Sequence, residues 1–347
     1  MRKTIFLFYI LVTWSSTTAQ ETYYNQTRHT QFVNPSFYGM NAQSFAGFGY
    51  NSLSYQTNET IDTKIFYGVM SFDNLNFSIS ADFSNFQVNQ YGLVQNLINL
   101  SYIYRLEVFN DTYFLPSLSV GLGFHQLENS ALIFGDQLNL ISGSISTTSN
   151  DPLSYSELNS NYLDFGAAML LYNENFMVGL SLKHLNQPDV SMNKEFNLKK
   201  PMSLSFQAAY ERDINYFGRS FLPNESYLYL YSSVTSVGQL MKIYAGQELL
   251  LGGFAFGIHE SYTSSEYTEI TLDGNQETKT SNALLMGINC GLNIEEFEFN
   301  LSYNFPLSQS SVVYPPNIFE LSMIIKFDRF LRNNRGYFKR LKIDGLF

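Results

Sequence analysis

The chain has 347 residues, of which 45% are hydrophobic and 14% are charged, whereas soluble domains are about 25% charged. Its net charge of −10 argues against nucleic-acid binding, because neutralising phosphates requires a basic surface. The single cysteine, Cys290, excludes an intramolecular disulfide and a cysteine-based metal cluster. A low charge together with 25 Tyr and 31 Phe is typical of a strand-rich membrane protein.

The first 19 residues predict a secretory signal peptide. Arg2 and Lys3 precede an apolar run that ends at Trp14, and small residues follow as far as Ala19. The alternative, a transmembrane helix, is disfavoured because the run has about ten residues and a membrane-spanning helix needs about 20. We therefore predict cleavage between Ala19 and Gln20 and export of the mature chain.

Fourteen segments of the mature chain show the two-residue period of a β-strand that is wetted on one side. In residues 75–83, LNFSISADF, apolar and polar side chains alternate throughout. No segment has a persuasive helical period. The other strand segments are residues 43–55, 63–72, 97–106, 117–125, 163–172, 176–185, 202–212, 227–234, 241–249, 254–260, 283–294, 297–305 and 319–327.

The connectors between these segments differ in length in a regular way. Tight turns follow even-numbered segments, at residues 73–74, 172–175 and 293–296. Long connectors follow odd-numbered segments, at residues 85–96, 126–162, 186–201, 261–282 and 306–318. Outer-membrane barrels have short turns on one rim and long loops on the other, and an even strand number returns both termini to the periplasmic rim. Residues 213–226 and 235–238 break this rule, which leaves open a miscounted strand near them.

Alternating strands fit either a soluble sandwich or a membrane barrel. The segregated connectors, and the tyrosines near strand ends, favour the barrel. We predict an all-β fold, a transmembrane antiparallel β-barrel of about 14 strands. Its parts are the signal peptide (residues 1–19), an N-terminal periplasmic or plug segment (residues 20–41), the barrel (residues 42–327) and a short basic C-terminal tail (residues 328–347).

Residues 171–192, LYNENFMVGLSLKHLNQPDVSM, show what the barrel implies for single side chains. One parity is apolar and is expected to face lipid, at Phe176, Val178, Leu180 and Leu182. The other is expected to face the lumen, at Gly179, Ser181 and Lys183. His184 shares the lipid parity, so we expect it at the rim. The strand ends before Pro188, which cannot donate to a sheet ladder.

Two loops are long enough to have a function of their own. Residues 260–279 contain Asp273-Gly274 between alternating polar residues, which predicts a type I′ hairpin. This hairpin is either a solvated loop or a surface for secreted cargo. Residues 127–161 are rich in Ser, Asn and Gly, and either fold into the lumen or cover its mouth.

The C-terminal tail is basic. Within residues 328–347 lie six of the 20 basic residues of the chain, namely Arg329, Arg332, Arg335, Lys339, Arg340 and Lys342. The tail is either solvated and disordered, or it docks on an acidic periplasmic partner or on anionic headgroups. In the second case these six residues would bind the partner.

No catalytic, cofactor-binding or metal-binding site is predicted. His29, His125, His184 and His259 lie far apart, without a metal-ligand neighbour at helical or hairpin spacing. No G-x-S-x-G motif is present. An enzyme is therefore the less favoured hypothesis, and no cofactor is expected.

Three stretches resemble the PorP/SprF family of type IX secretion system outer-membrane proteins of Bacteroidetes. They are QFVNPSFYG at residues 31–39, FGDQ at residues 134–137, and FGAAMLLYNENFMVGLSLKHLNQP at residues 165–188. The resemblance covers most of the mature chain. Its motif residues are Asn34, Pro35, Gly39, His184, Gln187 and Pro188, for which we expect structural roles.

The resemblance implies an outer-membrane protein that aids secretion or surface attachment of particular cargo, including gliding adhesins. Its expected partners are outer-membrane lipid, the periplasmic ring and lipoproteins of the secretion system, and the secreted cargo. The alternative is a FadL-like outer-membrane channel for a hydrophobic or small-molecule substrate, which would need a pocket in the lumen.

Overall fold

The computed structural model describes residues 25–55, 59–72, 75–90, 92–128, 133–138, 144–151, 158–192, 197–215, 221–223, 225–270, 276–308 and 316–327. The predicted signal peptide, the Asp273-Gly274 turn and the basic residues from Arg329 to Lys342 lie outside the described residues. Among the helices of the described part, none is long and apolar enough to cross a membrane.

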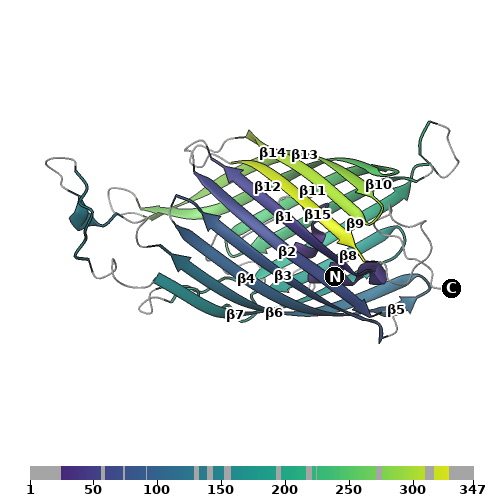
Figure 1. The fold of residues 1–347 in the computed structure, drawn as a ribbon, viewed down its shortest axis with the longest axis horizontal. Coiled ribbons are helices and arrows are strands. Elements are labelled where there is room, and N and C mark those ends of the chain that lie inside the picture. The colour runs from purple at the N-terminus through teal and green to yellow at the C-terminus, as the bar shows by residue number, and fades with distance from the viewer. Residues whose placement is uncertain are drawn as a thin grey trace, which may run out of the picture.

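Fourteen long antiparallel strands close into a barrel, as predicted (Figure 1). Strands consecutive in the chain are neighbours, β1 pairs with β15, and β4 pairs with β6, which closes the ring. The short strand β5 (Leu106–Phe109) pairs with β6 beside the ring. The long strands are β1 (Phe45–Ser54), β2 (Thr60–Phe72), β3 (Phe77–Val88), β4 (Leu93–Tyr104), β6 (Thr112–Leu127), β7 (Leu158–Tyr172), β8 (Phe176–Lys183), β9 (Ser203–Asp213), β10 (Ser226–Val237), β11 (Leu240–Leu251), β12 (Phe254–Ile270), β13 (Gln276–Ile294), β14 (Phe297–Ser308) and β15 (Asn317–Lys326).

Each of the fourteen predicted segments corresponds to one long strand, so the count near residues 213–238 was correct. The predicted long connectors at residues 85–96 and 261–282 are wrong, because β3 and β4 continue to Val88 and from Leu93, and β12 and β13 run from Phe254 to Ile270 and from Gln276. The apolar-outside alternation is lost at these strand ends, because β12 and β13 carry mostly polar residues there and β3 places Asn85 and Gln87 on its outer parity, although the backbone ladder continues. The sequence prediction also missed β5.

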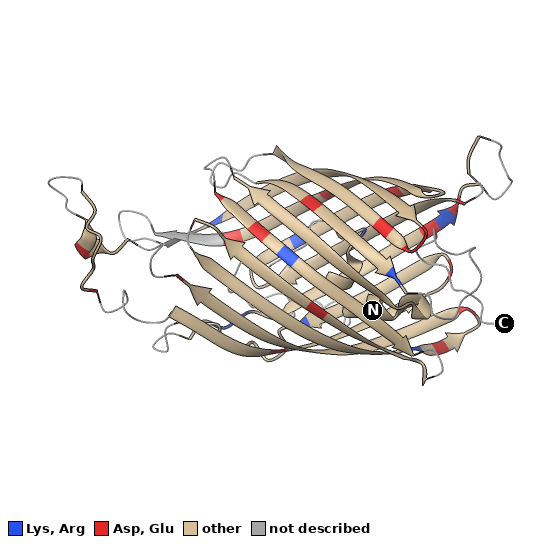
Figure 2. Ribbon diagram, viewed as in Figure 1, with Lys and Arg blue, Asp and Glu red and all other residues tan. Residues whose placement is uncertain are grey.

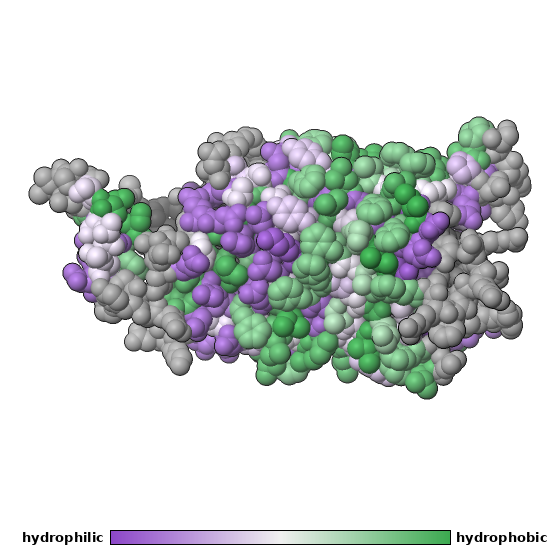
Figure 3. Space-filling model, viewed as in Figure 1, coloured by the Kyte–Doolittle hydropathy of each residue, from purple (hydrophilic) through white to green (hydrophobic). Residues whose placement is uncertain are grey.

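The outer face of the barrel is apolar and the inner face is polar. In β8, Phe176 and Val178 are 59% and 46% exposed, while Ser181, on the other parity, points inward and is 2% exposed. On the visible face, hydrophobic side chains cover the half of the barrel at the rim where β15 ends, and hydrophilic ones gather over β1 to β4 toward the other rim (Figure 3). A closed ring leaves no unpaired edge in lipid, so this face can lie against acyl chains.

The two rims differ. β7 and β8, and β13 and β14, are joined by turns of two or three residues at the rim where β1 begins and β15 ends. At the opposite rim, the β6–β7 connection carries the 3₁₀ turn η5 (Gly135–Gln137) well beyond the strands (Figure 1). Short turns and both barrel ends mark the periplasmic rim in outer-membrane barrels, so the rim with the β6–β7 connection faces the cell exterior.

Candidate functional site

Residues 25–42 lie inside the barrel, and we call them the lumenal segment (Figure 1). The segment forms two 3₁₀ turns, η1 (Thr30–Phe32) and η2 (Pro35–Ala42). Its polar residues Asn25, His29, Asn34 and Ser36 are each at most 1% exposed. Buried polar groups need partners, and these come from inward-facing side chains of the strands.

A buried ion pair anchors the start of the lumenal segment. The Arg28 guanidinium lies 2.6 Å from Glu248 Oε1 on β11 and 2.5 Å from Glu298 Oε1 on β14. Lys326, the last residue of β15, lies 3.2 Å from Glu298 Oε2. Gly291 on β13 makes room, because a Cβ there would lie 2.5 Å from Arg28 Nη2. Figure 2 shows that charged residues interrupt the strands of the barrel at scattered positions.

Asn34 ties the middle of the segment to three strands. Its side-chain amide donates to Met169 O on β7 at 3.1 Å, to Leu180 O on β8 at 3.3 Å and to Gln207 Oε1 on β9 at 3.0 Å. Its Oδ1 accepts from Ser36 N–H at 2.9 Å, so Asn34 also caps η2, whose first residue is Pro35. The close approach requires Gly179 on β8, since a Cβ there would lie 2.8 Å from Asn34 Nδ2.

Apolar packing holds the end of the segment. Phe37 and Tyr38 belong to a buried cluster with Tyr67, Ile103 and Leu170. Gly39 fits against the wall of this cluster, because a Cβ there would lie 2.7 Å from Ile103 Cγ2. The lumenal segment is therefore held by charge at one end, by amide bonds in its middle and by apolar contact at the other.

The hairpin formed by β7 and β8 makes further contacts with the lumenal segment. Ser181 Oγ donates to Val33 O at 2.8 Å, and Lys183 Nζ donates to Phe32 O. The two motifs singled out in the sequence, at residues 31–39 and 165–188, thus meet in the lumen.

The expected position of His184 at the rim, on the lipid parity, is wrong. Its backbone φ is 58°, in the left-handed region, so the alternation of β8 ends at Lys183 and the ring turns inward. His184 is 4% exposed, and its Nδ1 is hydrogen-bonded with Asp164 Oδ2 at 2.6 Å. Gln187 also has a positive φ, of 43°, and its N–H donates to His184 O. Pro188 O accepts from Lys200 N at 2.9 Å, which closes the loop.

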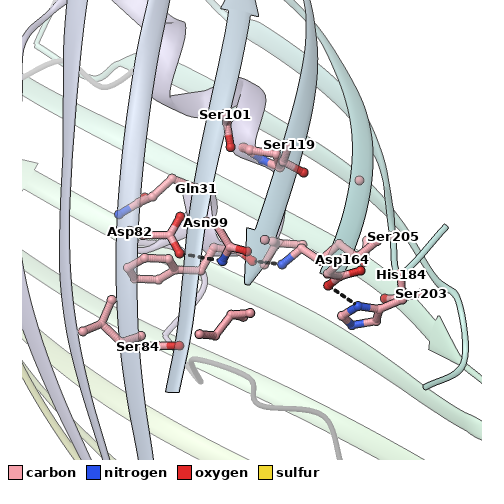
Figure 4. Close-up of a pocket in the computed structure, with 18 of the residues that line it drawn as sticks. Gln31, Asp82, Ser84, Asn99, Ser101, Ser119, Asp164, His184, Ser203 and Ser205 are labelled. Carbon is pink, nitrogen blue, oxygen red and sulfur yellow. Dashed lines mark hydrogen bonds and ion pairs between the residues drawn. The ribbon is translucent and has the colours of Figure 1, made fainter. Parts of the chain in front are cut away.

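A cavity of about 180 Å³ lies on the exterior side of residues 31–35 of the lumenal segment. Its wall includes Asp82, Asn99 and Asp164 from the middle of three strands (Figure 4). Its floor includes Phe32 and Val33 of the lumenal segment. Leu53, Ile65, Phe86 and Leu97 form an apolar part of the lining. The lumenal segment therefore bounds this cavity on its periplasmic side.

The cavity holds opposite charges in equal number. Its lining includes the acidic residues Asp82 and Asp164 and the basic residues Lys183 and Lys200. Asn99 Nδ2 donates to Asp82 Oδ2 at 2.7 Å. Asp164 is 7% exposed, and its Oδ1 has no hydrogen-bond partner among the described residues. The cavity can thus hydrogen-bond a ligand that presents donors, without a strong preference for one sign of charge.

In the described part of the chain, no three His, Cys, Asp or Glu side chains are grouped to hold a metal ion. His125 is 3.3 Å from the Tyr162 hydroxyl, and His259 is 2.5 Å from Asn304 Oδ1. Both histidines face the lumen as ordinary polar residues.

The sequence analysis missed the inward charges Arg28, Asp82 and Asp164. Asp82 and Asp164 had a usable signal, because each interrupts a strand at a position where a lipid-facing charge is costly, which implies a lumenal location. Arg28 had none, since its segment has no strand periodicity.

Solved structures similar to the chain are outer-membrane barrels. The CymD monoaromatic hydrocarbon channel has a TM-score of 0.52 and 11% sequence identity, with 86% of this chain and 92% of that chain covered. An outer-membrane channel from Pseudomonas putida F1 has a TM-score of 0.41 and 12% identity, with coverages of 82% and 96%. At such low identity the likeness concerns the fold alone. No curated protein sequence matches the chain.

The sequence profile described as "Type IX secretion system membrane protein PorP/SprF" matches residues 16–325. The match includes the lumenal segment, all strands of the barrel except the last residue of β15, and the β8 hairpin. The chain belongs to the PorP/SprF family of type IX secretion system membrane proteins and is an outer-membrane β-barrel.

Proposed function

We propose that this outer-membrane component of the type IX secretion system aids the secretion or surface attachment of particular cargo, including adhesins such as those of gliding motility. It acts by binding proteins and does not catalyse a reaction. The observation that carries the proposal is the lumenal segment, which Arg28 and Asn34 attach to five strands within a family match over residues 16–325. A lumen held shut in this way favours partner contacts over free diffusion.

The expected periplasmic partners are the ring and lipoprotein components of the secretion system. The basic tail supplies a surface for them, with Arg329, Arg332, Arg335, Lys339, Arg340 and Lys342 as the contact residues. Charged groups of this kind steer association with an acidic partner more than they add affinity. Signal-peptide cleavage between Ala19 and Gln20 would leave the mature protein free to insert into the outer membrane.

Deletion of the gene, followed by comparison of the secreted and surface-attached proteins, tests the role. We expect a few cargo proteins to disappear from the cell surface and medium, and re-expression of the full chain to restore them. An unchanged set of secreted proteins would refute the proposal.

Deletion of residues 329–347 tests the tail separately. We expect less recovery of secretion-system components in pull-down from membranes, with normal barrel insertion. Replacement of the six basic residues by Gln in the full-length chain is the matched control for length. Unchanged recovery with both variants would exclude docking by the tail.

The cavity favours a second candidate function, a channel for a hydrophobic or small-molecule substrate. In that case the purified barrel in planar bilayers would conduct ions, or vesicles containing it would take up a small solute. A closed barrel in both assays, combined with loss of cargo on gene deletion, would leave the secretion role.

A further inference from the structure

Asp164 is unusual because one of its carboxylate oxygens has no partner among the described residues, although the side chain is 7% exposed. A buried unpaired acceptor destabilises the fold, and such groups in native proteins call for an explanation. His184 satisfies the other oxygen and fixes the carboxylate at the cavity wall (Figure 4). The unpaired oxygen is buried beside the cavity, and a hydrogen-bond donor of a ligand that reached it would satisfy it.

The lining narrows the chemistry of that ligand. The charged groups of Asp82, Asp164 and Lys183, of which Asp164 is buried, disfavour a pure hydrocarbon, because it would displace water from them without offering a hydrogen bond. The balance of two acidic and two basic residues disfavours a polyanion or a polycation.

The apolar part of the lining narrows it further. Leu53, Ile65 and Leu97 are aliphatic, and Phe86 adds one aromatic ring. Such a surface suits an apolar side chain better than a sugar, while the serines and Asn99 of the polar part offer donors and acceptors. A polypeptide combines all three features, since its backbone carries donors and acceptors and its side chains include apolar ones.

The position of the cavity limits how the ligand enters. The lumenal segment forms the floor, so access is from the exterior rim. The space suits a chain end or the tip of a loop and not a folded domain. We propose that this cavity binds a short peptide segment of a secreted protein, with Asp164 accepting a hydrogen bond from its backbone or side chain. This proposal rests on the proposed role in secretion and assigns that role a site.

A tryptophan introduced at Phe86 would report binding directly. Trp14 is the single tryptophan of the chain and lies in the predicted signal peptide, so Phe86→Trp gives the mature barrel one fluorophore at the cavity. The probe is the capped tripeptide acetyl-Gly-Leu-Ser-amide, added to the purified mature barrel in detergent. We expect a saturable change in emission. Phe299→Trp, on the lipid-facing side of β14, is the matched control and should not respond.

Asp164→Asn, combined with Phe86→Trp, tests the contact itself. The substitution keeps the shape but removes the charge, so we expect the tripeptide to bind about tenfold more weakly, as for loss of a hydrogen bond to a charged group. Heat-modifiable migration checks that the variant is folded. The absence of a saturable response to the tripeptide at millimolar concentration would overturn the proposal, as would an equal response to maltose or toluene.

A cellular experiment separates this proposal from the role in secretion. In a strain that carries Asp164→Asn, or Ser205→Trp to fill the cavity, we expect the cargo lost on gene deletion to be lost as well. If deletion removes the cargo while both variants secrete it normally, the peptide site is wrong and the role in secretion stands. If deletion itself changes nothing, the role in secretion fails first.

Discussion

Asn34 links the lumenal segment to β7, β8 and β9 through one side-chain amide. An amide can do this because its nitrogen carries two hydrogens, here shared among three acceptors, while its oxygen accepts from Ser36 N–H. Aspartate has the same shape but cannot donate to the carbonyls of Met169 and Leu180. The residue type is therefore set by the strands that surround it and not by the turn alone.

Replacement of Asn34 by Ala should loosen the lumenal segment. The buried Gln207 amide and the two strand carbonyls would each lose a donor. Each buried acceptor left without a partner lowers the free energy of unfolding by about 1–3 kcal/mol. We expect a lower melting temperature in detergent and faster protease cleavage within residues 25–42. Asn85→Ala is the control, since Asn85 bonds to Asn96 on the outer face of the barrel. Equal effects of both changes would contradict the assigned role.

Asp189 provides a prediction about pH in the loop after β8. Hydrogen bonds from the Ser191 hydroxyl and from the N–H groups of Ser191 and Leu198 hold the pKa of Asp189 below its ordinary value. A lowered pKa means that the ionised carboxylate stabilises the loop above the ordinary pKa of aspartate, and that this stabilisation is lost as the pH falls through the lowered value.

NMR titration of the full-length protein, labelled with ¹³C at aspartate, measures this pKa. Ser191→Ala should raise it toward the ordinary value, whereas Ser191→Thr keeps the hydroxyl and should leave it low. If Asp189 has the same pKa in both variants, the Ser191 hydroxyl is not the main cause of the lowered pKa.

At the scale of elements, alternation of side chains predicted the strands well because lipid and lumen impose opposite polarity on the two faces. It failed where that contrast ends. Strands β12 and β13 continue beyond the apolar surface with mostly polar residues, and the end of β3 has polar residues, Asn85 and Gln87, on its outer parity, so there the sequence resembles a loop. His184 was misplaced for a related reason, since one left-handed residue reverses the parity and the sequence does not reveal it. The motifs at Asn34 and His184 were found in the sequence, but their meeting in the lumen depends on the closed ring.

The lipid-facing surface of β6 can be tested with lysine substitutions at two different depths in the membrane. Val120 lies near the middle of the strand and is exposed on the outer face, while Gln126 has the same parity near the exterior rim. Val120→Lys should destabilise the barrel by about 2–4 kcal/mol and Gln126→Lys by about 0–1 kcal/mol. Reversible unfolding in detergent or lipid vesicles measures the difference. Similar losses for both would mean that Val120 does not face hydrocarbon.

At the scale of the whole molecule, the barrel and the lumenal segment depend on each other. The segment fills the periplasmic half of the lumen, and the strands supply the partners for its buried polar groups. Opening of the lumen therefore requires the loss of an ion pair, an amide cluster and an apolar contact together. We expect the wild-type barrel to stay closed under ordinary conditions.

Arg28→Met tests this closure. It leaves Glu248 and Glu298 without their buried partner, which costs about 3–5 kcal/mol when one member of a buried pair is removed. The lumenal segment should then leave its place often enough to give current bursts in planar bilayers. Arg212→Met, an exposed arginine on the outer parity of β9, is the matched control and should remain silent. Silent recordings from Arg28→Met in a folded barrel would show that the segment does not depend on this ion pair.

Glu298 holds Arg28 with one carboxylate oxygen and Lys326 with the other, and Lys326 is the penultimate residue before the tail begins at residue 328. A pulling force on the chain after Phe327 is thus transmitted to the start of the lumenal segment through two ion pairs, Lys326–Glu298 and Glu298–Arg28. A partner that pulls on the tail from the periplasm would strain the same carboxylate that keeps the lumen shut. Force applied at one end of the polypeptide can in this way act on the other end, although the two are about 300 residues apart in the chain.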